Sequence, residues 1–249
     1  MKTEVNWHAR FTQQASWTSS LRSHLYQKVD LHAAKMVLEV GCGTGAILTD
    51  LPTITDAKIH GLDLDLARLK EARGHIPSAH FVNGDALALP YPDRIFDVCL
   101  CHFLLLWVGD PLQVLCEMHR ATHPGGAILV MAEPDYSQRI DTPLEMVYLG
   151  EMQTSSLRKQ GADPVIGSKL PDLFSQSGID LIETGTLQKM DPVGLKAEDW
   201  ELEWEVLESD LAGLLPASEI AALKQIDLQA RLKGERTLFV PTHFAWGRV

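Results

Sequence analysis

Residues 37–45, Val-Leu-Glu-Val-Gly-Cys-Gly-Thr-Gly, constrain the fold of this chain more than any other stretch. The β-branched and apolar run 36–40 predicts a buried strand, and three glycines at alternate positions predict a tight turn into the apolar segment 46–51, where we expect a helix to begin. Because glycine has no Cβ atom, such a turn can adopt positive φ angles and lets a ligand lie against bare backbone. The free N–H groups at the start of a helix favour a negatively charged or polar group. We therefore expect a flat, polar ligand at this turn.

The spacing of the glycines separates this turn from the dinucleotide-binding fingerprint. That fingerprint is Gly-x-Gly-x-x-Gly with a pyrophosphate on the helix N-terminus, whereas here the third glycine comes one residue earlier. Glu39 lies two residues before the first glycine, where it would repel a pyrophosphate and favour a cationic ligand. A second predicted strand, 58–62, ends at Asp63, which should lie beside Glu39 at the carboxyl edge of a parallel sheet. Such an acid can accept hydrogen bonds from a ribose diol.

These residues resemble the first two motifs of the class I S-adenosylmethionine-dependent methyltransferases, an acidic-x-Gly-x-Gly-x-Gly turn and a second acid. The segment from Glu39 to Gly45 matches the turn, and Asp63 matches the second acid. The resemblance covers roughly residues 37–190, because four later segments match in order: 83–86, 93–102, 119–126 and 161–178. It implies S-adenosylmethionine as the cofactor, a sulfonium cation with an amino-acid end and an adenosine end, and S-adenosylhomocysteine as its product.

The resemblance also implies roles for individual residues at the cofactor. Asp63 is expected to accept hydrogen bonds from the ribose, and Asp85 to hold the adenine amino group, with the Ala86 N–H on the ring beside it. The plainer role for Asp85 is to cap a turn after Gly84. The residues expected to bind the cofactor are Glu39, Gly41, Cys42, Gly43, Gly45, Asp63, Leu64, Asp85, Ala86 and His102.

After residue 36, short apolar strands alternate with capped helices, a pattern typical of a parallel sheet covered on both faces. With the resemblance, this predicts an α/β fold: a three-layer Rossmann-like sandwich whose seven-stranded, mostly parallel sheet has its last strand antiparallel beside the fifth. We expect a single methyltransferase domain over 1–249. Its parts are an N-terminal helical cap (6–30), a cofactor-binding half (37–133), a helical substrate insert (134–176) and a C-terminal part that completes the sheet (177–249).

Local signals place several ends of these elements. Asp65 is a good N-cap for a helix over 66–73, with Gly74 as its left-handed stop. The triplet 141–143, Asp-Thr-Pro, starts a helix that ends at Gly161. Two further strands are predicted near the C-terminus, with an acidic helix and then a helix over 219–233 between them; these strands are 179–189 and 237–249.

The formal net charge of −11 argues against a nucleic-acid surface, because phosphate binding needs clustered lysine and arginine. Much of the acidic excess is local, since residues 191–235 hold 11 acids against 4 bases. Apolar residues recur there at helical spacing, so we expect the acids to form the solvated side of an amphipathic helix. Those apolar residues are Trp200, Trp204, Leu207, Leu211 and Leu214, and both tryptophans are expected in the core.

The cysteines and the hydropathy profile bound the remaining chemistry. Cys42, Cys99, Cys101 and Cys116 lack the spacing of metal ligands, so we expect packing roles and no metal site. Cys99 and Cys101 should face the same side of one strand. Thiol-assisted methylation of a metalloid, as in arsenic-methylating relatives, is the alternative. The chain shows neither the apolar core of a signal peptide nor a run near the length of a membrane span, so we expect a cytoplasmic protein.

Two segments lie outside the expected cofactor scaffold, residues 6–30 and 134–176. In the family, such segments cover the cofactor and form the acceptor-binding insert, so specificity is expected from them and from the loop after His102. Apolar residues follow helical spacing through 6–30, and Trp17 lies off that stripe. The residues expected to bind the substrate are Phe11, Trp17, Asp135, Tyr136, Arg139 and Tyr148.

Methyl transfer from a sulfonium is an in-line displacement, so the protein mainly has to align donor and acceptor. A general base helps only where the acceptor must lose a proton. The candidates are His102 after the fourth strand, and Glu133 and Tyr136 after the fifth. His102 can equally line the cofactor site, and Glu133 can fix the turn before Pro134 or accept from a backbone N–H.

The function that fits these observations best is a methyltransferase for a small molecule, of the type that modifies quinone precursors, sterols and other secondary metabolites. The compact chain with a modest insert supports this interpretation. Methylation of a protein and a non-catalytic S-adenosylmethionine-binding role are the alternatives. A nicotinamide dehydrogenase is disfavoured by the glycine spacing and by Glu39. The acceptor atom (O, N, C or S) and the oligomeric state stay open at this point.

Overall fold

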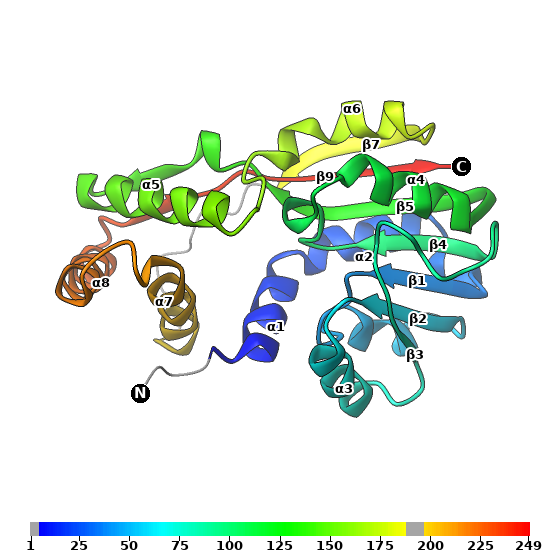
Figure 1. Cartoon of the computed structure of the whole chain (residues 1–249), viewed down its shortest axis with the longest axis horizontal. Helices are drawn as coiled ribbons and strands as arrows, with labels where there is room; N and C mark the ends of the chain where they lie inside the picture. The colour runs from blue at the N-terminus through cyan, green and yellow to red at the C-terminus, as the bar shows by residue number, and fades with distance from the viewer. Residues whose placement is uncertain (1–4, 188–196) are drawn as a thin grey trace.

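The computed structural model describes residues 5–187 and 197–249. Its centre is a seven-stranded sheet in the order β3-β2-β1-β4-β5-β9-β7 (Figure 1). Strands β1 to β5 run parallel, and β9 lies antiparallel between β5 and β7. The predicted α/β fold, with its last strand antiparallel beside the fifth, is confirmed. The strands are β1 (Met36–Val40), β2 (Lys58–Asp63), β3 (His80–Asn83), β4 (Phe96–Cys101), β5 (Thr122–Pro134), β7 (Asp180–Leu187) and β9 (Thr242–Arg248).

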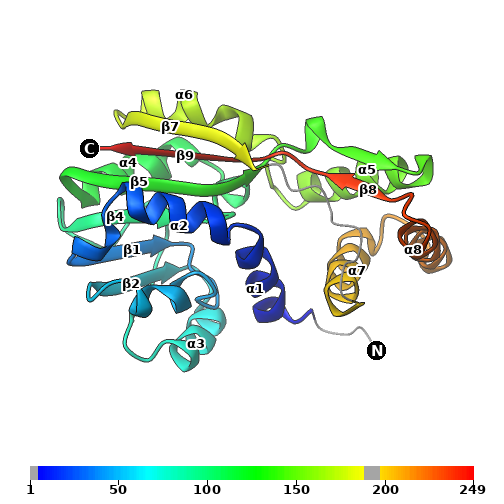
Figure 2. The same cartoon turned by 180° about the vertical axis from the view of Figure 1, so that it is seen from behind.

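Helices cover both faces of the sheet and complete a three-layer sandwich. Because successive side chains of a strand point to opposite faces, Leu38 of β1 enters one core and Val37 the other. The first core packs against α4 (Pro111–Ala121) and α6 (Leu170–Gln176). The second packs against α3 (Leu66–His75) and against α2 (Ser19–Lys28), which crosses the sheet in Figure 2. Cys99 and Cys101 both lie in the first core, as their spacing predicts.

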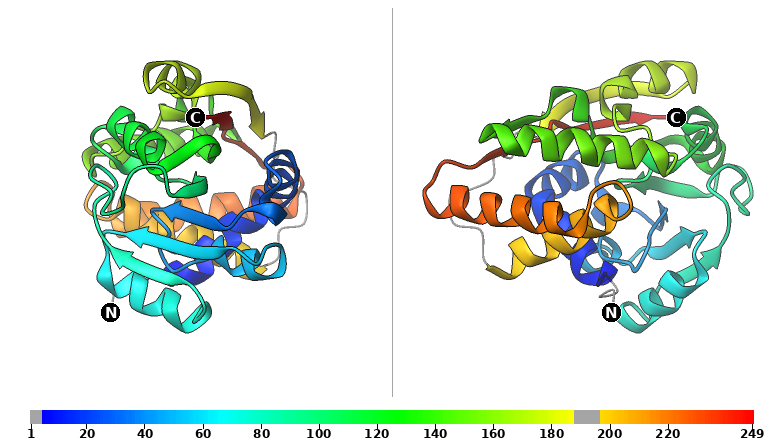
Figure 3. Two further views of the ribbon diagram at one scale, coloured as in Figure 1. Left: turned by 90° about the vertical axis from the view of Figure 1, so that its right-hand side faces the viewer. Right: turned by 60° about the vertical axis from the view of Figure 1, so that its left-hand side comes forward.

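A separate helical region stands beyond one end of the sheet (Figures 1 and 3). It consists of α5 (Leu144–Lys159), α7 (Ala197–Leu211) and α8 (Ala217–Leu232), which share a third core that contains Trp200 and Trp204. A two-stranded sheet of β6 (Ile140–Thr142) and β8 (Thr237–Phe239) joins this region to the main sheet. The helical region therefore draws on both 134–176 and 177–249, whereas α6 packs on the main sheet.

The N-terminal segment forms two helices with different neighbours. Asn6 caps α1 (Trp7–Trp17) by accepting from the Ala9 N–H at 3.0 Å, and the helix ends at Thr18. After this break, α2 joins the sheet, while α1 stands between the sheet and the helical region (Figure 2). Gln13 of α1 donates to the Asp199 carbonyl of α7 at 2.9 Å, so α1 bridges the two parts of the molecule.

Two expectations about the cofactor-binding half need correction. The segment after the glycines forms a turn and then the 3-10 helix η2 (Leu48–Thr53) in place of an α-helix, because Pro52 has no N–H to extend an α-helical ladder. The helix α3 continues through Gly74 to His75, so Gly74 is not its left-handed stop; Asp65 is its N-cap, as predicted.

Two more expectations differ in the C-terminal half. Asp141 belongs to β6 and does not cap a helix; α5 begins after Pro143 without a side-chain cap, although it ends before Gly161 as predicted, with Gly161 at φ +88°. The predicted strand 237–249 is two strands, β8 and β9, which belong to different sheets. The predicted strand 179–189 is β7, and its last two residues lie outside the described residues.

Among the described helices, none is both long enough and apolar enough to cross a bilayer.

Candidate active site

The glycine turn after β1 has the backbone geometry that its sequence predicts. Gly41, Gly43 and Gly45 have φ angles of +72°, +51° and +81°, a region that residues with a Cβ atom rarely adopt. The Gly41 and Cys42 N–H groups donate to the Leu62 carbonyl at 2.7 and 2.9 Å, which fixes the turn to the end of β2. A Cβ atom at Gly45 would lie 2.8 Å from Ile76, so this glycine serves the packing of the turn against α3 and its flank.

Asp63 connects the glycine turn to the end of β2. One of its carboxylate oxygens accepts from the Gly43 N–H at 2.7 Å, and the other accepts from the Asp65 N–H at 2.8 Å. The side chain is 8% exposed and lines a cavity. Because each carboxylate oxygen can accept more than one hydrogen bond, Asp63 can hold the turn and still accept from a ligand.

Leu64 follows β2 and Asp85 follows β3, so both residues lie at the carboxyl ends of these neighbouring strands. The Asp85 Oδ1 atom accepts from the Leu87 N–H at 2.9 Å, so the plainer capping role is present. Within the described part of the chain the Oδ2 atom accepts no hydrogen bond, and Asp85 and Ala86 both line the cavity. Leu64 is 74% exposed and offers an apolar surface at the cavity wall. The arrangement suits a flat ring with a polar edge.

Glu39 is a buried carboxyl group that faces the cavity. It is 2% exposed, and its Oε2 atom has no hydrogen-bond partner in the described part of the chain. Burial raises the pKa of Glu39 well above its usual value, and the nearby Arg22 guanidinium opposes that shift. An unsatisfied buried carboxyl oxygen is costly unless a ligand donates to it, so Glu39 is suited to a ligand that carries a cationic donor.

The cavity has a volume of about 670 Å³ and joins the glycine turn to the helical region. Of the ten predicted cofactor residues, nine line it, and Gly45 does not. Of the predicted substrate residues, Phe11, Trp17, Tyr136 and Arg139 line it. Asp135 lies outside the lining, because it caps the short helix η4 (Tyr136–Gln138) by accepting from the Ser137 N–H at 2.9 Å. Tyr148 also lies outside, on the side of α5 that faces Glu219.

His102 lies directly after β4, in the wall of the cavity. Its Nε2 atom is 3.0 Å from the Thr18 hydroxyl, which itself donates to the Ala15 carbonyl and accepts from Arg22. Nε2 is therefore the protonated nitrogen, and His102 fixes the break between α1 and α2. Burial lowers the pKa of His102 to about 3, with a smaller contribution from Arg22, so the ring is neutral at pH 7.

This depressed pKa predicts a specific loss of stability in acid. The unfolded chain protonates His102 below about pH 6.5, whereas the folded chain does not until about pH 3, so the contribution of the neutral ring is complete above pH 6.5 and falls by about 1.4 kcal/mol per pH unit below it. Between pH 6.5 and 5, wild type should lose about 2 kcal/mol more unfolding free energy than His102→Gln, measured by urea denaturation at both pH values. Equal pH dependence of the two proteins would contradict a neutral, buried His102.

Glu133 is fully buried and lies outside the cavity lining, although the sequence placed it among the catalytic candidates. Its two oxygens accept from the N–H groups of Leu104, Leu105 and Leu106 at 3.0, 2.8 and 3.1 Å. Burial raises the pKa of Glu133 to about 8, and these backbone donors limit the rise. The residue therefore shapes the loop after β4, which is the second role that the sequence allowed.

Glu133→Gln is expected to destabilise the chain by about 3 kcal/mol, because its amide NH₂ would face a backbone N–H in a buried site. The free energy of unfolding in urea is the measurement. Glu145→Gln, an exchange on the surface of α5, is the control and should stay within about 0.5 kcal/mol of wild type. A Glu133→Gln variant as stable as this control would rule out the backbone cradle.

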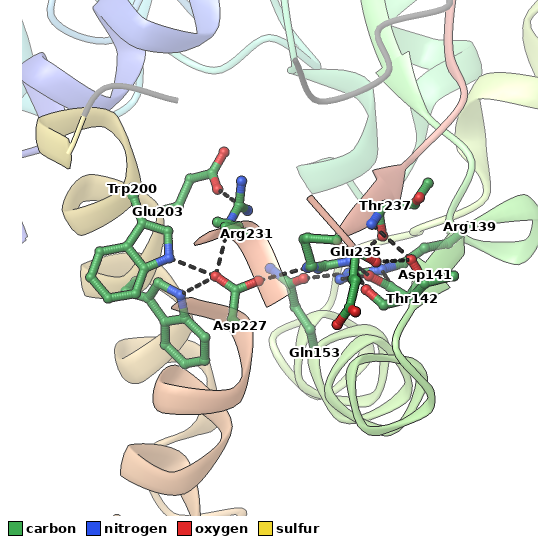
Figure 4. Close-up of polar contacts among 12 residues, drawn as sticks. Arg139, Asp141, Thr142, Gln153, Trp200, Glu203, Asp227, Arg231, Glu235 and Thr237 are labelled. Carbon is green, nitrogen blue, oxygen red and sulfur yellow. Dashed lines mark hydrogen bonds and ion pairs between the residues drawn. The ribbon is translucent and has the colours of Figure 1, made fainter. Parts of the chain in front are cut away.

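A chain of alternating charges lies at the helical end of the cavity (Figure 4). Asp141 pairs with Arg139 and Arg236 at 2.5 and 2.8 Å, and Arg236 pairs with Asp227 at 2.6 Å. Asp227 is 2% exposed and also accepts from both buried indoles, those of Trp200 at 2.6 Å and Trp204 at 3.0 Å. Its pKa is lowered because the arginines and indole donors outweigh the burial that would raise it.

The sequence analysis missed this network and assigned the acids of α7 to solvent. Trp200 and Trp204 are in the core as predicted, but Glu203 and Asp210 on the same helix line the cavity. The signal in the sequence was the pair of core tryptophans, because a buried indole N–H needs an acceptor and α8 carries Asp227. Arg10 on α1 was also missed; it lines the cavity with its guanidinium 5.0 Å from the Trp17 ring centroid.

Part of this chain is similar in sequence to a known protein family and to curated proteins. Residues 38–130 match the model of the methyltransferase domain family. The demethylmenaquinone methyltransferase of Renibacterium salmoninarum is 37% identical over 114 residues, 45% of this chain and 46% of that protein. The malonyl-[acyl-carrier protein] O-methyltransferase of Serratia marcescens is 33% identical over 98 residues, 39% of this chain and 38% of that protein. This chain thus spans less than half the length of these curated relatives.

Solved structures match a larger share of the chain at low sequence identity. The [4+2]-cyclase SpnF has a TM-score of 0.58 at 18% identity, covering 92% of this chain and 81% of that one. A phosphoethanolamine N-methyltransferase of Haemonchus contortus, in complex with phosphomonomethylethanolamine and S-adenosylhomocysteine, has a TM-score of 0.54 at 16% identity, covering 86% of this chain and 48% of that one. At these identities the likeness shows the shared fold alone.

Proposed function

We propose that this chain, a class I S-adenosylmethionine-dependent methyltransferase by its matched domain and its fold, transfers a methyl group to a small-molecule acceptor. The observation that carries the proposal is the shape of the cavity. It is continuous from the glycine turn, where this family holds its cofactor, to a chamber between α1, α5 and α7. A donor and an acceptor can therefore meet inside one cavity.

The residues at the glycine turn fit S-adenosylmethionine. Glu39 offers a buried carboxyl oxygen without a partner, which suits the amino group of the methionine end. Asp63 can accept from the ribose hydroxyls, and the free oxygen of Asp85 can accept from the adenine amino group, with Leu64 against the ring. When bound, S-adenosylmethionine supplies an electrophilic methyl group on a positively charged sulfur. The acids around the turn favour such a cation.

The walls of the chamber support a small acceptor over a protein. Phe11 and Trp17 of α1 line one side, and Leu149 of α5 and Trp204 of α7 line the other. The Gln13 to Asp199 hydrogen bond, at 2.9 Å, holds α1 to α7, the two helices that contribute these walls. A small molecule needs only to fit the volume of about 670 Å³ between these helices. Aromatic and aliphatic walls with a few polar groups are typical of such sites.

Catalysis in this proposal rests on alignment. The chain holds the acceptor in line with the sulfonium, which can supply several kcal/mol of the barrier. Glu133 cannot act as a base because its oxygens are held by backbone N–H groups away from the cavity. His102 is neutral but its Nε2 is committed to Thr18, which leaves Nδ1 as its acceptor atom. Tyr136 lines the cavity, and burial raises its pKa, so it serves as a neutral hydrogen-bonding group.

The test is binding followed by turnover. Calorimetry of the purified chain with S-adenosylmethionine, S-adenosylhomocysteine and NAD should give micromolar or tighter binding of the first two and none of the third. A metabolite library, with release of S-adenosylhomocysteine as the readout, then tests methyl transfer. Binding without turnover on the library, together with turnover on a protein extract, would favour a protein acceptor. Binding with no turnover on either would favour a non-catalytic role.

A further inference from the structure

Two histidines and a glutamate from two helices converge outside the cavity lining. Glu71 and His75 lie one turn apart on α3, and His8 lies on α1. One ligand atom from each of the three residues lies within 4.8 Å of the other two. We propose that His8, Glu71 and His75 bind one divalent cation of the zinc type, and that this cation holds α1 against α3.

The chemistry of these donors fits such an ion. Two imidazole nitrogens and one carboxylate oxygen form a ligand set that Zn²⁺ takes readily, with a fourth position left for water. Glu71 and His75 are exposed and free to adjust, and His75 Nε2 already lies 3.9 Å from a Glu71 oxygen.

A second observation, independent of the three ligands, points to the same site. His8 Nδ1 lies 2.8 Å from the hydroxyl of Thr44, which is fully buried inside the glycine turn. Metal-binding histidines generally use their second ring nitrogen in such a hydrogen bond, which fixes the orientation of the ring. The bond to Thr44 leaves Nε2 of His8 for the cation. It also links the proposed metal site directly to the turn that the cofactor occupies in this family.

Binding requires a local rearrangement that the structure makes easy to describe. The rings of His8 and His75 are stacked, with centroids 3.8 Å apart and planes inclined by 9°. A nitrogen lone pair lies in the plane of its ring, so two stacked rings cannot share one ion; with His8 held by Thr44, the ring of His75 must turn out of the stack. Side-chain rotation of His75 on the surface of α3 can provide most of this change.

A cation at this site would act on α1, the helix that covers the glycine turn. Phe11 of α1 covers the glycine turn so closely that a Cβ atom at Gly43 would lie 3.1 Å from its ring. Arg68 of α3 lies 5.6 Å and 5.4 Å from the ring centroids of Trp7 and Phe11, so α1 already rests on α3. A cation at His8 would restrain the helix that covers the turn. If the turn holds the cofactor, as the proposed function requires, this restraint slows the exchange of the cofactor.

The first experiment measures metal binding without any cofactor. Zn²⁺ is titrated into the tag-free chain against a chromophoric chelator, and Co²⁺ absorption reports the ligand geometry. We expect one equivalent per chain, with affinity lowered at least about tenfold in His75→Ala and Glu71→Gln and about tenfold in Thr44→Val. His24→Ala is the matched control, because His24 is an exposed histidine that pairs with one carboxylate, Glu183 at 3.1 Å; it should bind like wild type. Circular dichroism checks that each variant is folded.

Two outcomes overturn the metal site: no stoichiometric Zn²⁺ binding by wild type, or the same loss of affinity in His24→Ala as in His75→Ala. Either result leaves the proposed methyltransferase function untouched, since no cofactor is present.

The second experiment measures the dissociation rate of S-adenosylhomocysteine with and without Zn²⁺. Zn²⁺ should slow dissociation from wild type and have no effect on His75→Ala. Equal rates in wild type with and without bound Zn²⁺ would overturn the restraint of α1.

Discussion

Asp63→Ala is expected to weaken binding of S-adenosylmethionine about 100-fold, or about 2.7 kcal/mol, while the chain stays folded. In the structure, Asp63 orders the glycine turn by accepting from the Gly43 N–H at 2.7 Å. In the proposed complex it also accepts from the ribose, and hydrogen bonds to a charged group contribute about 1.5–3 kcal/mol each. Losing both the ligand contact and the order of the turn explains the size of the effect. Calorimetry with S-adenosylmethionine and S-adenosylhomocysteine is the measurement.

The matched control for this prediction lies two residues further along the chain. Asp65 caps α3 by accepting from the N–H groups of Ala67 and Arg68, and it does not line the cavity. Asp65→Ala should cost about 1 kcal/mol of stability and leave the dissociation constant within about twofold of wild type. If Asp63→Ala bound the cofactor as tightly as Asp65→Ala does, the assignment of Asp63 to the ribose would be wrong.

The cofactor side of the site could be predicted because its determinants are local in sequence. The positive φ angles follow from the three alternate glycines, and Glu39, Asp63 and Asp85 each follow from their place at the end of a strand. In a parallel sheet all strand ends of one kind meet at one edge, so residues far apart in sequence come together by topology alone. The structure places these acids at the wall of one cavity, and their roles at the cofactor stay predictions.

The charge network at the helical end of the cavity could not be predicted because its residues are joined by tertiary contacts. Asp141 belongs to a triplet typical of a helix start, yet it lies in β6 and pairs with Arg236. Nothing in the sequence around either residue indicates that pairing. Helical spacing correctly placed Trp204 in the core but assigned the neighbouring Glu203 to solvent, although α1 and α5 cover that side of α7. Hydrophobic periodicity can reveal a buried helix face only where that face packs against an apolar surface. The surface that covers this side of α7 is charged, so periodicity does not reveal it.

The same tertiary network gives the largest stability effect that we expect. Asp227→Ala should lower the free energy of unfolding by about 4 kcal/mol, because it removes one carboxylate that serves four donors. Those donors are the two indoles, at 2.6 and 3.0 Å, and the guanidinium groups of Arg231 and Arg236, at 2.9 and 2.6 Å. Breaking a buried ion pair by removing one partner leaves an uncompensated charge, which costs about 3–5 kcal/mol. For a chain of this size the midpoint of thermal unfolding should fall by about 10 °C.

The comparison that decides this prediction is Glu201→Ala, which removes an exposed acid of α7 that pairs with Lys224 at 3.0 Å. That variant should lose less than about 1 kcal/mol, because exposed ion pairs contribute little. Asp227→Ala should keep the cofactor affinity of wild type, since the glycine turn and its acids lie at the other end of the cavity, but should lose turnover as the chamber walls separate. Equal unfolding free energies for the two variants would show that the charge network does not hold α7 and α8 together.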